Sequence, residues 1–496
     1  MRSQPDYDEF LKLASKGNFV PVYCDVLADA LTPVAAYAKL SASKPAFIFE
    51  SVVGGEQISR YSFVGCNPRK VISVKGKEAT IRLRTGETET FAAPDDPLSL
   101  IESELTSRKT AMPPGMPRFS GGAVGYLAYE YANCVESTVP LPANDSLDLP
   151  LLYFMMAESV VIFDHARQTL RICVYARPDQ DPKSAYDDAR NEIQGILDTL
   201  RTDATVSTVH LQLMDMPEIP PPGNFTRQEF ESLVDRAKEY IKAGDVIQTV
   251  LSQRFSCPFE DDPINLYRAL RIVNPSPYMF LLEDEEFAII GASPEVHVRM
   301  TGEEALIRPI AGTRPRGRDD EEDRRLEAEL LADEKERAEH LMLVDLARND
   351  LGRVCRHGEV RVPEYMIVEK YSHVMHIVSE VVGRLQPGKN AFDLMRATFP
   401  AGTVSGAPKV RAMQIISELE NLQRNAYAGA LGYFGFDGSH DSCIAIRTAM
   451  LKDGILSIQS GAGIVADSIP SNEYLETINK AKGMLQAVQL AEAFSE

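Results

Sequence analysis

Two pairs of glutamates carry the spacing that could hold a divalent cation. Glu336 and Glu339 are three residues apart in one helical stretch, and Glu473 and Glu476 are three apart in another. Residues three apart share one face of a helix, so each pair can point both carboxylates the same way. Four carboxylates from two helices would make an oxygen site suited to Mg²⁺, which takes one or two protein carboxylates directly and keeps waters. Either pair by itself is more typical of a solvated helix face.

A glycine segment near the C-terminal end could approach an anion with bare backbone N–H groups. Gly461-Ala462-Gly463 follows a predicted strand and loosely matches the dinucleotide-binding pattern. That pattern needs a parallel strand before it and a helix that opens inside it. Here the preceding strand belongs to an Asp453-Gly454 hairpin and the next helix starts only after Pro470, so a nicotinamide cofactor is disfavoured. What remains is a turn that contacts a carboxylate, or a tight turn without a ligand.

Two loops and one histidine add groups that could do chemistry. Gly312-Thr313 is followed by arginines that could bind an anion or pair with the acids of the next helix. Thr403 lies among small residues just before a predicted helix, and helix N-termini attract anions. His376 is interleaved with apolar residues. It is either a structural histidine or a general base, because histidine titrates near neutral pH.

Several nucleotide and hydrolase motifs do not occur in the sequence. It contains no Gly-x-x-x-x-Gly-Lys-Ser/Thr loop, which disfavours a P-loop nucleotide enzyme. It also contains no Gly-x-Ser-x-Gly elbow and no Gly-x-Cys-x-Gly nucleophile turn. The chain therefore has no obvious hydrolase nucleophile and no glutaminase of its own for making ammonia.

Local patterns predict the elements that must position these residues. A capping box at Thr226–Glu229 starts a helix, and residues 246–255 follow as a strand. A long charged helix is predicted from Glu321 to Asn349, and Ser471 is predicted to cap the last helix. Strands joined by hairpins, with helices between some of them, predict an α+β fold with antiparallel or mixed sheets covered by helices.

Composition and length restrict the class of protein. A chain of 496 residues is too long for one hydrophobic core, and the Pro/Gly-rich segment 216–223 predicts a boundary between residues 1–215 and 224–496. A net charge of −20 disfavours nucleic-acid and anionic-membrane partners. The acidic start and the lack of a long apolar run disfavour a signal peptide and a membrane span. Seven scattered cysteines indicate free thiols in a reducing, cytoplasmic setting.

Taken together and in this order, the segments resemble the chorismate-utilising enzymes, and most closely the component I family of anthranilate synthases. The resemblance covers essentially all of residues 224–496 and is looser before them. The matching segments are Gly244–Gln248, Asn274–Met279, Gly291–Glu295, Ile310–Gly317, Glu339–Asp350, Tyr371–His376, Pro400–Lys409 and Gly461–Glu476, with Glu50-Ser51 and Arg60–Gly65 in the N-terminal part. So many ordered motifs make the resemblance specific, although each motif alone is weak.

The resemblance implies a fold, an activity and a set of roles. The fold would be a two-sheet, mostly antiparallel sandwich with helices on the outside and an N-terminal regulatory portion. The activity would be a Mg²⁺-dependent lyase reaction of chorismate, a dianion, with ammonia. Glu339 and Glu476 would bind Mg²⁺ with Glu336 and Glu473 in support, Glu295 would protonate the departing hydroxyl near Thr403, and His376 would take the ring proton. Substrate contacts would come from Gly312, Thr313, Tyr427, Arg447, Gly461, Ala462 and Gly463.

The resemblance also implies regulation and a partner. The family has a tryptophan-binding regulatory pocket, which would serve feedback inhibition of tryptophan biosynthesis. In this chain its lining would be Glu50, Ser51, Pro277, Tyr278, Met279, Gly291 and Cys443. Ammonia would come from a separate glutamine amidotransferase subunit, which implies a hetero-oligomer. The missing glutaminase nucleophile agrees with that expectation.

Two other readings within the family, and one outside it, stay open at this stage. Aminodeoxychorismate synthases carry a nucleophilic lysine where this chain has Ala311, and isochorismate and salicylate synthases carry a water-activating lysine where it has Gln248. Neither side chain can replace that lysine, so both departures favour ammonia as the nucleophile. The outside alternative is a catalytically inactive protein that senses an amino acid. Because Glu, His and Arg occupy the motif positions, the sequence favours an enzyme.

Overall fold

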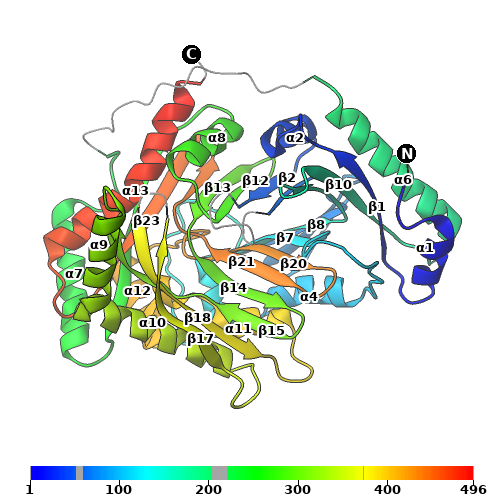
Figure 1. Cartoon of the computed structure of the whole chain (residues 1–496). Coiled ribbons are helices and arrows are strands. Elements are labelled where there is room, and N and C mark those ends of the chain that lie inside the picture. The colour runs from blue at the N-terminus through cyan, green and yellow to red at the C-terminus, as the bar shows by residue number, and fades with distance from the viewer. Residues whose placement is uncertain (1, 52–59, 180, 204–219, 372–373, 495–496) are drawn as a thin grey trace.

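The structure is a computed structural model that describes residues 2–51, 60–179, 181–203, 220–371 and 374–494. Two large sheets form its centre, and helices cover the outer faces (Figure 1). Neighbouring strands within the described ranges pair antiparallel. The predicted α+β sandwich is therefore confirmed.

The first sheet has eleven strands within the described residues. In spatial order they are β1 (Val20–Leu27), β10 (Thr169–Ala176), β9 (Ser159–Asp164), β3 (Tyr61–Cys66), β2 (Ala46–Glu50), β12 (Tyr278–Glu283), β13 (Phe287–Ser293), β22 (Thr448–Lys452), β23 (Ile455–Ile464), β11 (Gln248–Pro258) and β19 (Gly406–Ala407).

The second sheet has twelve strands within the same residues. They are β16 (Ile310–Pro315), β18 (Val374–Arg384), β15 (Glu304–Ile307), β14 (Val296–Thr301), β21 (His440–Ile444), β20 (Ala430–Gly435), β7 (Gly122–Leu127), β8 (Leu152–Ala157), β4 (Lys70–Lys75), β5 (Glu78–Leu83) and β6 (Thr88–Ala92), with β17 (Arg361–Lys370) paired to β18.

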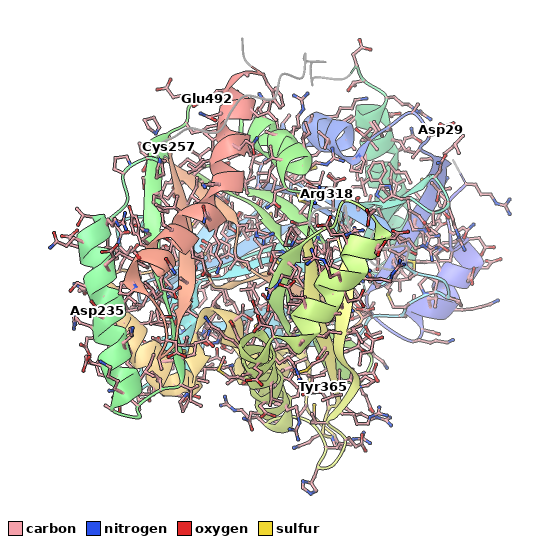
Figure 2. The ribbon with its side chains drawn as sticks, turned by 60° about the vertical axis from the view of Figure 1, so that its left-hand side comes forward. Asp29, Asp235, Cys257, Arg318, Tyr365 and Glu492 are labelled. Atoms are coloured by element: carbon pink, nitrogen blue, oxygen red, sulfur yellow. The ribbon has the colours of Figure 1, made fainter. Side chains whose placement is uncertain are left out.

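The helices lie around this centre. They are α1 (Tyr7–Ala14), α2 (Pro33–Leu40), α4 (Leu98–Thr106), α5 (Ala132–Val135), α6 (Pro182–Leu200), α7 (Arg227–Lys242), α8 (Pro263–Val273), α9 (Asp320–Ala332), α10 (Glu334–Gly352), α11 (Ala391–Thr398), α12 (Lys409–Glu420) and α13 (Pro470–Glu492), with 3₁₀ turns η1 (Tyr129–Tyr131) and η2 (Gly402–Val404). Charged side chains such as Asp235 on α7 and Glu492 on α13 project from their outer faces (Figure 2). No helix in the described part of the chain is long and apolar enough to cross a bilayer.

Aromatic side chains form the contact between the two sheets. Phe287 of the first sheet packs edge-on against Tyr126 and Tyr153 of the second, with ring centroids 6.2 and 5.2 Å apart. Such edge-to-face pairs add to the stabilisation that comes from burying the rings. A second apolar cluster lies on the other face of the first sheet and includes Tyr267 of α8 and Leu485 of α13. Both faces of that sheet are therefore buried, which explains its nearly continuous apolar strands.

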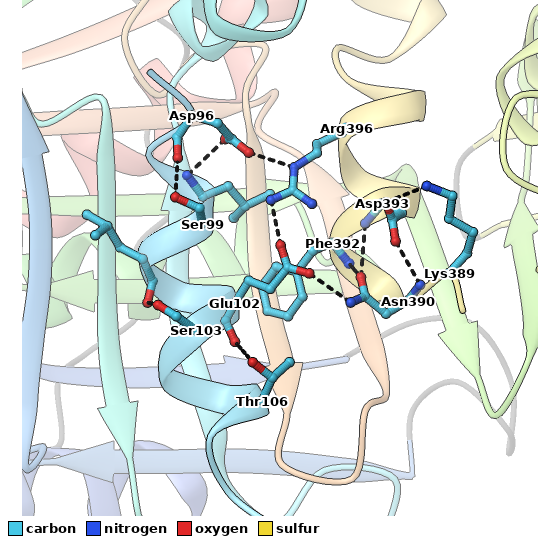
Figure 3. A network of polar contacts seen from close by, with 12 residues as sticks. Asp96, Ser99, Glu102, Ser103, Thr106, Lys389, Asn390, Phe392, Asp393 and Arg396 are labelled. Carbon is cyan, nitrogen blue, oxygen red and sulfur yellow. Dashed lines mark hydrogen bonds and ion pairs between the residues drawn. The ribbon is translucent and has the colours of Figure 1, made fainter. Parts of the chain in front are cut away.

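The N-terminal and C-terminal parts of the chain share both sheets. Strand β2 pairs with β12 in one sheet, and β7 pairs with β20 in the other. A polar network also links α4 to α11: Arg396 contacts Asp96 at 2.7 Å and Glu102 at 2.6 Å, and Asn390 donates to Glu102 at 2.8 Å (Figure 3). The division into residues 1–215 and 224–496 stays a prediction, and residues 216–219 of its boundary lie outside the described ranges.

Three local predictions need correction. The predicted helix from Glu321 to Asn349 is two helices, because Asp333 is extended and its carboxylate caps α10 by accepting from the N–H groups of Lys335 and Glu336. Ser471 does not cap α13, which begins at Pro470 after Ile469, in line with the preference of proline for the first turn. The glycines 461–463 form no turn but belong to β23, paired with β11.

Candidate active site

A cavity of about 280 Å³ opens where both sheets meet α10 and α13. Strands β11 and β23 supply one wall, and the two helices supply the opposite one. Of the residues predicted for the site, those that line it are Glu339, Thr403, Tyr427, Arg447, Gly461, Gly463, Glu473 and Glu476. The fold thus gathers in one cavity side chains that are up to 137 positions apart in the chain.

Three carboxylates in this cavity meet three cationic side chains. Glu339, Glu473 and Glu476 line it together with Lys335, Arg447 and Lys480. Burial raises the pKa of Glu339, and the nearby carboxylates of Glu336 and Glu476 raise it further. Burial and Glu476 likewise raise the pKa of Glu473, against a hydrogen bond from Ser468 that lowers it. Crowded carboxylates of this kind favour a bound cation.

The carboxylates fit a magnesium ion that takes only part of its coordination from the protein. Among the described residues, no three His, Cys, Asp or Glu side chains lie close enough to hold a metal by themselves. Mg²⁺ is commonly bound through one or two carboxylates, with waters and substrate oxygens completing the octahedron. The cavity's charges cancel without a metal, so a divalent ion would leave two positive charges for an anionic ligand.

Glu336 is placed differently from the other three carboxylates. It is not among the lining residues of the cavity; it pairs with Arg314 at 3.2 Å in the first turn of α10. Gly312 lies beside it in the left-handed region with φ of 70°, and a Cβ there would lie 3.2 Å from the Glu336 carboxylate. The Glu336 side chain is thus directed toward β16, whereas Glu339, three residues later on α10, lines the cavity.

Glu295 is a buried acid with a raised pKa. It follows β13 and is 6% exposed, and burial raises its pKa to about 7. The Thr403 hydroxyl donates to its carboxylate at 2.6 Å, and Arg447 and Lys480 act on it electrostatically; these contacts lower the pKa but do not overcome burial. A carboxyl group that is half protonated near neutral pH is suited to general-acid catalysis. Glu295 itself lies behind Thr403 rather than in the cavity lining.

His376 is held in one tautomer. Its Nδ1 is 3.0 Å from the backbone carbonyl of Gly312, and a carbonyl can only accept. Nδ1 therefore carries the proton, and Nε2 keeps its lone pair. Burial lowers the pKa of the ring, so the imidazole is neutral near pH 7. The Thr313 hydroxyl lies 3.0 Å from the same Nδ1. Gly312, Thr313 and His376 thus form one group at the β16–β18 pairing, outside the cavity lining.

Arg447 connects the two candidate proton-transfer groups. Its φ of 50° places it in the left-handed region between Ile446 and β22. The guanidinium lines the cavity and acts electrostatically on both Glu295 and His376. An anionic substrate held at Arg447 would alter the electrostatic environment of both groups.

Two glycines allow the cavity wall to approach its neighbours. A Cβ at Gly461 would lie 2.9 Å from the Tyr427 hydroxyl, and one at Gly463 would lie 2.5 Å from Nε2 of Gln248. Ala462, between them, points to the other face of β23 and belongs to the apolar core. The Oε1 of Gln248 is buried and has no hydrogen-bond partner within the described residues, so it can accept from a ligand.

Sequence reasoning did not assign the lysines of this site. Lys480 contacts Glu476 at 2.7 Å and donates to the Gly461 carbonyl at 3.0 Å. It lies four residues after Glu476 on the same helix, so the spacing could have indicated it. Lys335 offers the same signal four residues before Glu339. Only the fold shows that these side chains reach the cavity rather than solvent.

A second cavity, of about 50 Å³, gathers residues predicted for regulation. Those that line it are Glu50, Ser51, Pro277, Tyr278, Met279 and Cys443. Gly291 does not line it but lies opposite Phe280 on the neighbouring strand β13, where a Cβ would lie 2.2 Å from the Phe280 ring that also lines the cavity. The Tyr267 hydroxyl donates to Glu50 at 2.6 Å, and Arg271 approaches the same carboxylate at 3.0 Å.

Comparison with known proteins identifies the family. Residues 44–486 match the family described as chorismate binding enzyme, and the chain belongs to that family. It is 46% identical over 492 residues to anthranilate synthase component 1 of Pseudomonas putida, which covers 98% of this chain and 99% of that protein. The protein of the same name from Aquifex aeolicus is 45% identical, covering 99% of this chain and 98% of that protein.

Solved structures agree on the fold. Anthranilate synthase component I from Streptococcus pneumoniae TIGR4 superposes with a TM-score of 0.77 at 37% identity, covering 93% of this chain and 99% of that chain. The menaquinone-specific isochorismate synthase of Escherichia coli superposes with a TM-score of 0.69 at 17% identity, covering 97% and 99% of the two chains, and it shares the fold. The resemblance drawn from the motifs is therefore confirmed.

Proposed function

We propose that this chain is the chorismate-converting subunit of an anthranilate synthase. It would turn chorismate and ammonia into anthranilate and pyruvate, the first committed step of tryptophan biosynthesis. The observation that carries the proposal is that Arg447, which lines the cavity, acts electrostatically on both Glu295, with a pKa of about 7, and neutral His376. Relatives with this activity in their names match the full length of the chain.

The first half of the reaction needs an acid. Chorismate is a dianion, and Arg447 with Lys480 supplies positive charge in the cavity. Mg²⁺, bound by Glu339 and Glu476, would supply a Lewis-acidic anchor for the ring carboxylate. Protonated Glu295, aligned by the Thr403 hydroxyl, donates its proton to the C4 hydroxyl, which leaves as water while ammonia adds at C2 and loses a proton.

The second half needs a base. Nε2 of His376 accepts the proton from C2, and the electron pair left behind expels the enolpyruvyl oxygen from C3. The ring becomes aromatic, and the released enolpyruvate takes up a proton to become pyruvate. The hydrogen bond to the Gly312 carbonyl keeps the proton of the neutral ring on Nδ1, so Nε2 can accept a proton in each turnover.

Two positions support ammonia as the nucleophile. Ala311 cannot attack the ring as a lysine could, and Gln248 cannot deprotonate water. The unpartnered Oε1 of Gln248 can instead accept a hydrogen bond from ammonia. Since the sequence holds no glutaminase nucleophile, a separate amidotransferase subunit would deliver ammonia, and the functional assembly would be a hetero-oligomer.

The test uses the isolated chain. We would incubate it with chorismate, Mg²⁺ and a high ammonium concentration and follow anthranilate by fluorescence, with glutamine replacing ammonium in a parallel sample. Anthranilate should form with ammonium and not with glutamine. Chromatography that shows 4-amino-4-deoxychorismate or isochorismate as the end product would overturn the proposal. Robust use of glutamine would overturn the separate-subunit part of it.

We further propose that the 50 Å³ cavity binds tryptophan as a feedback inhibitor. The buried Glu50 carboxylate can face the amino group, and apolar residues such as Met279 can face the indole. Glu50→Gln should abolish inhibition by tryptophan and leave turnover intact, whereas Glu285→Gln, an exposed control, should change neither. Tryptophan binding without any turnover in the unmodified chain would favour the inactive sensor instead.

A further inference from the structure

A cleft beside α6 is distinct from the two cavities described above. It has a volume of about 680 Å³ and is bounded by α6, the ends of β9 and β10, and the β4–β5 hairpin. None of its lining residues lines the active-site cavity or the 50 Å³ cavity. It therefore needs an explanation of its own.

The inner end of the cleft holds an excess of positive charge. Glu158 is 7% exposed and contacts three arginines: Arg108 at 2.7 Å, Arg69 at 3.7 Å, and Arg177. Glu104 is shared between Arg108 and Lys70. Four basic side chains thus share two carboxylates, which leaves two positive charges uncompensated in a protein whose net charge is −20.

These guanidinium groups are held in fixed positions. Arg108 lies over the ring of Phe19 at 4.8 Å and over that of Phe436 at 5.2 Å, and Arg177 lies over Phe19 at 5.5 Å. The Nε of Arg177 is buried and finds no acceptor among the described residues. Burial and the neighbouring guanidinium groups of Arg108 and Arg69 lower the pKa of Arg177, although Glu158 opposes this. An anion would relieve the repulsion and could use the free N–H.

The outer wall of the cleft has the opposite charge. Asp188 of α6 is exposed on this wall, where the Ser184 hydroxyl donates to its carboxylate at 3.4 Å. Asp181 caps α6, and Glu192 already pairs with Arg84 and accepts a hydrogen bond from Ser159. A ligand that spans the cleft would therefore place its anionic end at Arg177 and an amino group near Asp188.

We propose that this cleft binds a small phosphomonoester that also carries an amino group. A doubly charged phosphate would balance the two uncompensated positive charges of this cluster by contacting Arg69 and Arg177, which line the cleft, and Arg177 is positioned for it by Glu158 and Phe19. The amino group would supply the charge complementary to Asp188. The site is independent of the proposed chorismate chemistry.

The test measures binding by isothermal titration calorimetry on the full chain in phosphate-free buffer at low salt. The probes are inorganic phosphate and O-phosphoethanolamine. Both should bind one to one, with phosphoethanolamine the tighter. Arg177→Gln should weaken both by at least about tenfold, while Arg167→Gln, 72% exposed outside the cleft, should leave both unchanged. Asp188→Asn should weaken only phosphoethanolamine.

A second variant separates binding from folding. Arg69 is 48% exposed, so Arg69→Gln should fold even if Arg177→Gln does not, and it should also weaken phosphate binding. The proposal is overturned if neither probe binds at concentrations up to roughly 10 mM. It is equally overturned if phosphate binds but the folded Arg69 and Arg177 variants bind it as well as the Arg167 variant does.

Discussion

The Thr403 hydroxyl donates a 2.6 Å hydrogen bond to the carboxylate of Glu295, across 108 positions of sequence. The two residues belong to different layers: Glu295 follows β13, and Thr403 lies in the 3₁₀ turn η2. The bond stabilises the ionised carboxylate and so limits how far burial raises its pKa.

Removing this bond should move the pH dependence of turnover. Thr403→Val should raise the pKa of Glu295 above about 7. Because the acid must be protonated to donate, the fall in rate at alkaline pH should then occur at a higher pH. The rate would be measured from pH 6 to pH 9 at a constant concentration of free ammonia. Thr403→Ser keeps the donor and should keep the original limb. An unchanged limb in the valine variant would show that Glu295 is not the acid.

Replacing His376 should separate the two halves of the reaction. General-base catalysis contributes about 10²–10⁴-fold, and the proposed mechanism assigns His376 to the second half only. His376→Met should therefore consume chorismate and accumulate a non-aromatic amino product that retains the enolpyruvyl group, with little pyruvate. Chromatography and a pyruvate assay would measure this. Anthranilate at the normal rate would make His376 a structural histidine, and untouched chorismate in a folded variant would assign it to the first half.

Neutralising the cavity carboxylates should abolish the turnover that depends on Mg²⁺. Glu339→Gln and Glu476→Gln keep the side-chain shape but lose the charge that holds a hard cation, so each should abolish Mg²⁺-dependent turnover. Glu334→Gln, on the exposed first turn of α10, is the matched control and should behave like the unmodified chain. Calorimetric titration with Mg²⁺ gives a readout besides activity. Normal rates at saturating Mg²⁺ in both variants would place the metal elsewhere.

The buried Glu420–Arg424 pair should be a structural support of the cavity. Both side chains are 1% exposed, and Arg424 also donates to the carbonyls of Val404 and Val250, which line the cavity. Arg424→Met leaves a buried carboxylate unpaired and should destabilise the chain by about 3–5 kcal/mol, measured by denaturant unfolding.

Two comparisons test that interpretation. Arg227→Met breaks an exposed pair of the same i,i+4 spacing with Glu231 and should lower the stability much less than Arg424→Met does. The double change Glu420→Leu with Arg424→Met removes both charges and should recover much of the stability lost in the single variant. An Arg424→Met chain as stable as the Arg227→Met chain would contradict the assignment.

Signals that lie within a few residues were predicted correctly from the sequence. The capping box at Thr226–Glu229 starts α7 as expected, and Asp453-Gly454 joins β22 to β23. These patterns work because the interactions that fix them are local. The ordered motifs were sufficient to indicate the family, since each one describes a short segment whose role depends on its own residues.

Other features depend on contacts between distant segments. The acidic run of residues gave no signal of the helix break at Asp333 or of the contact between Glu336 and Arg314. The pattern of glycines 461 and 463 was interpreted as a turn, but these positions are small because Tyr427 and Gln248 approach them closely. The raised pKa of Glu295 comes from burial, which no local pattern reports.

The sequence by itself indicated the family, many of the helices and strands, and the candidate site residues, because each of these depends on short segments. Only the tertiary structure determined which charged side chains contact one another. It brought Lys480 to the active-site cavity and three arginines to Glu158, since long-range strand pairing places residues from separate segments side by side. The pKa of a group and the charge of a cavity depend on burial and on neighbouring charged groups, and the order of residues in the chain does not specify either.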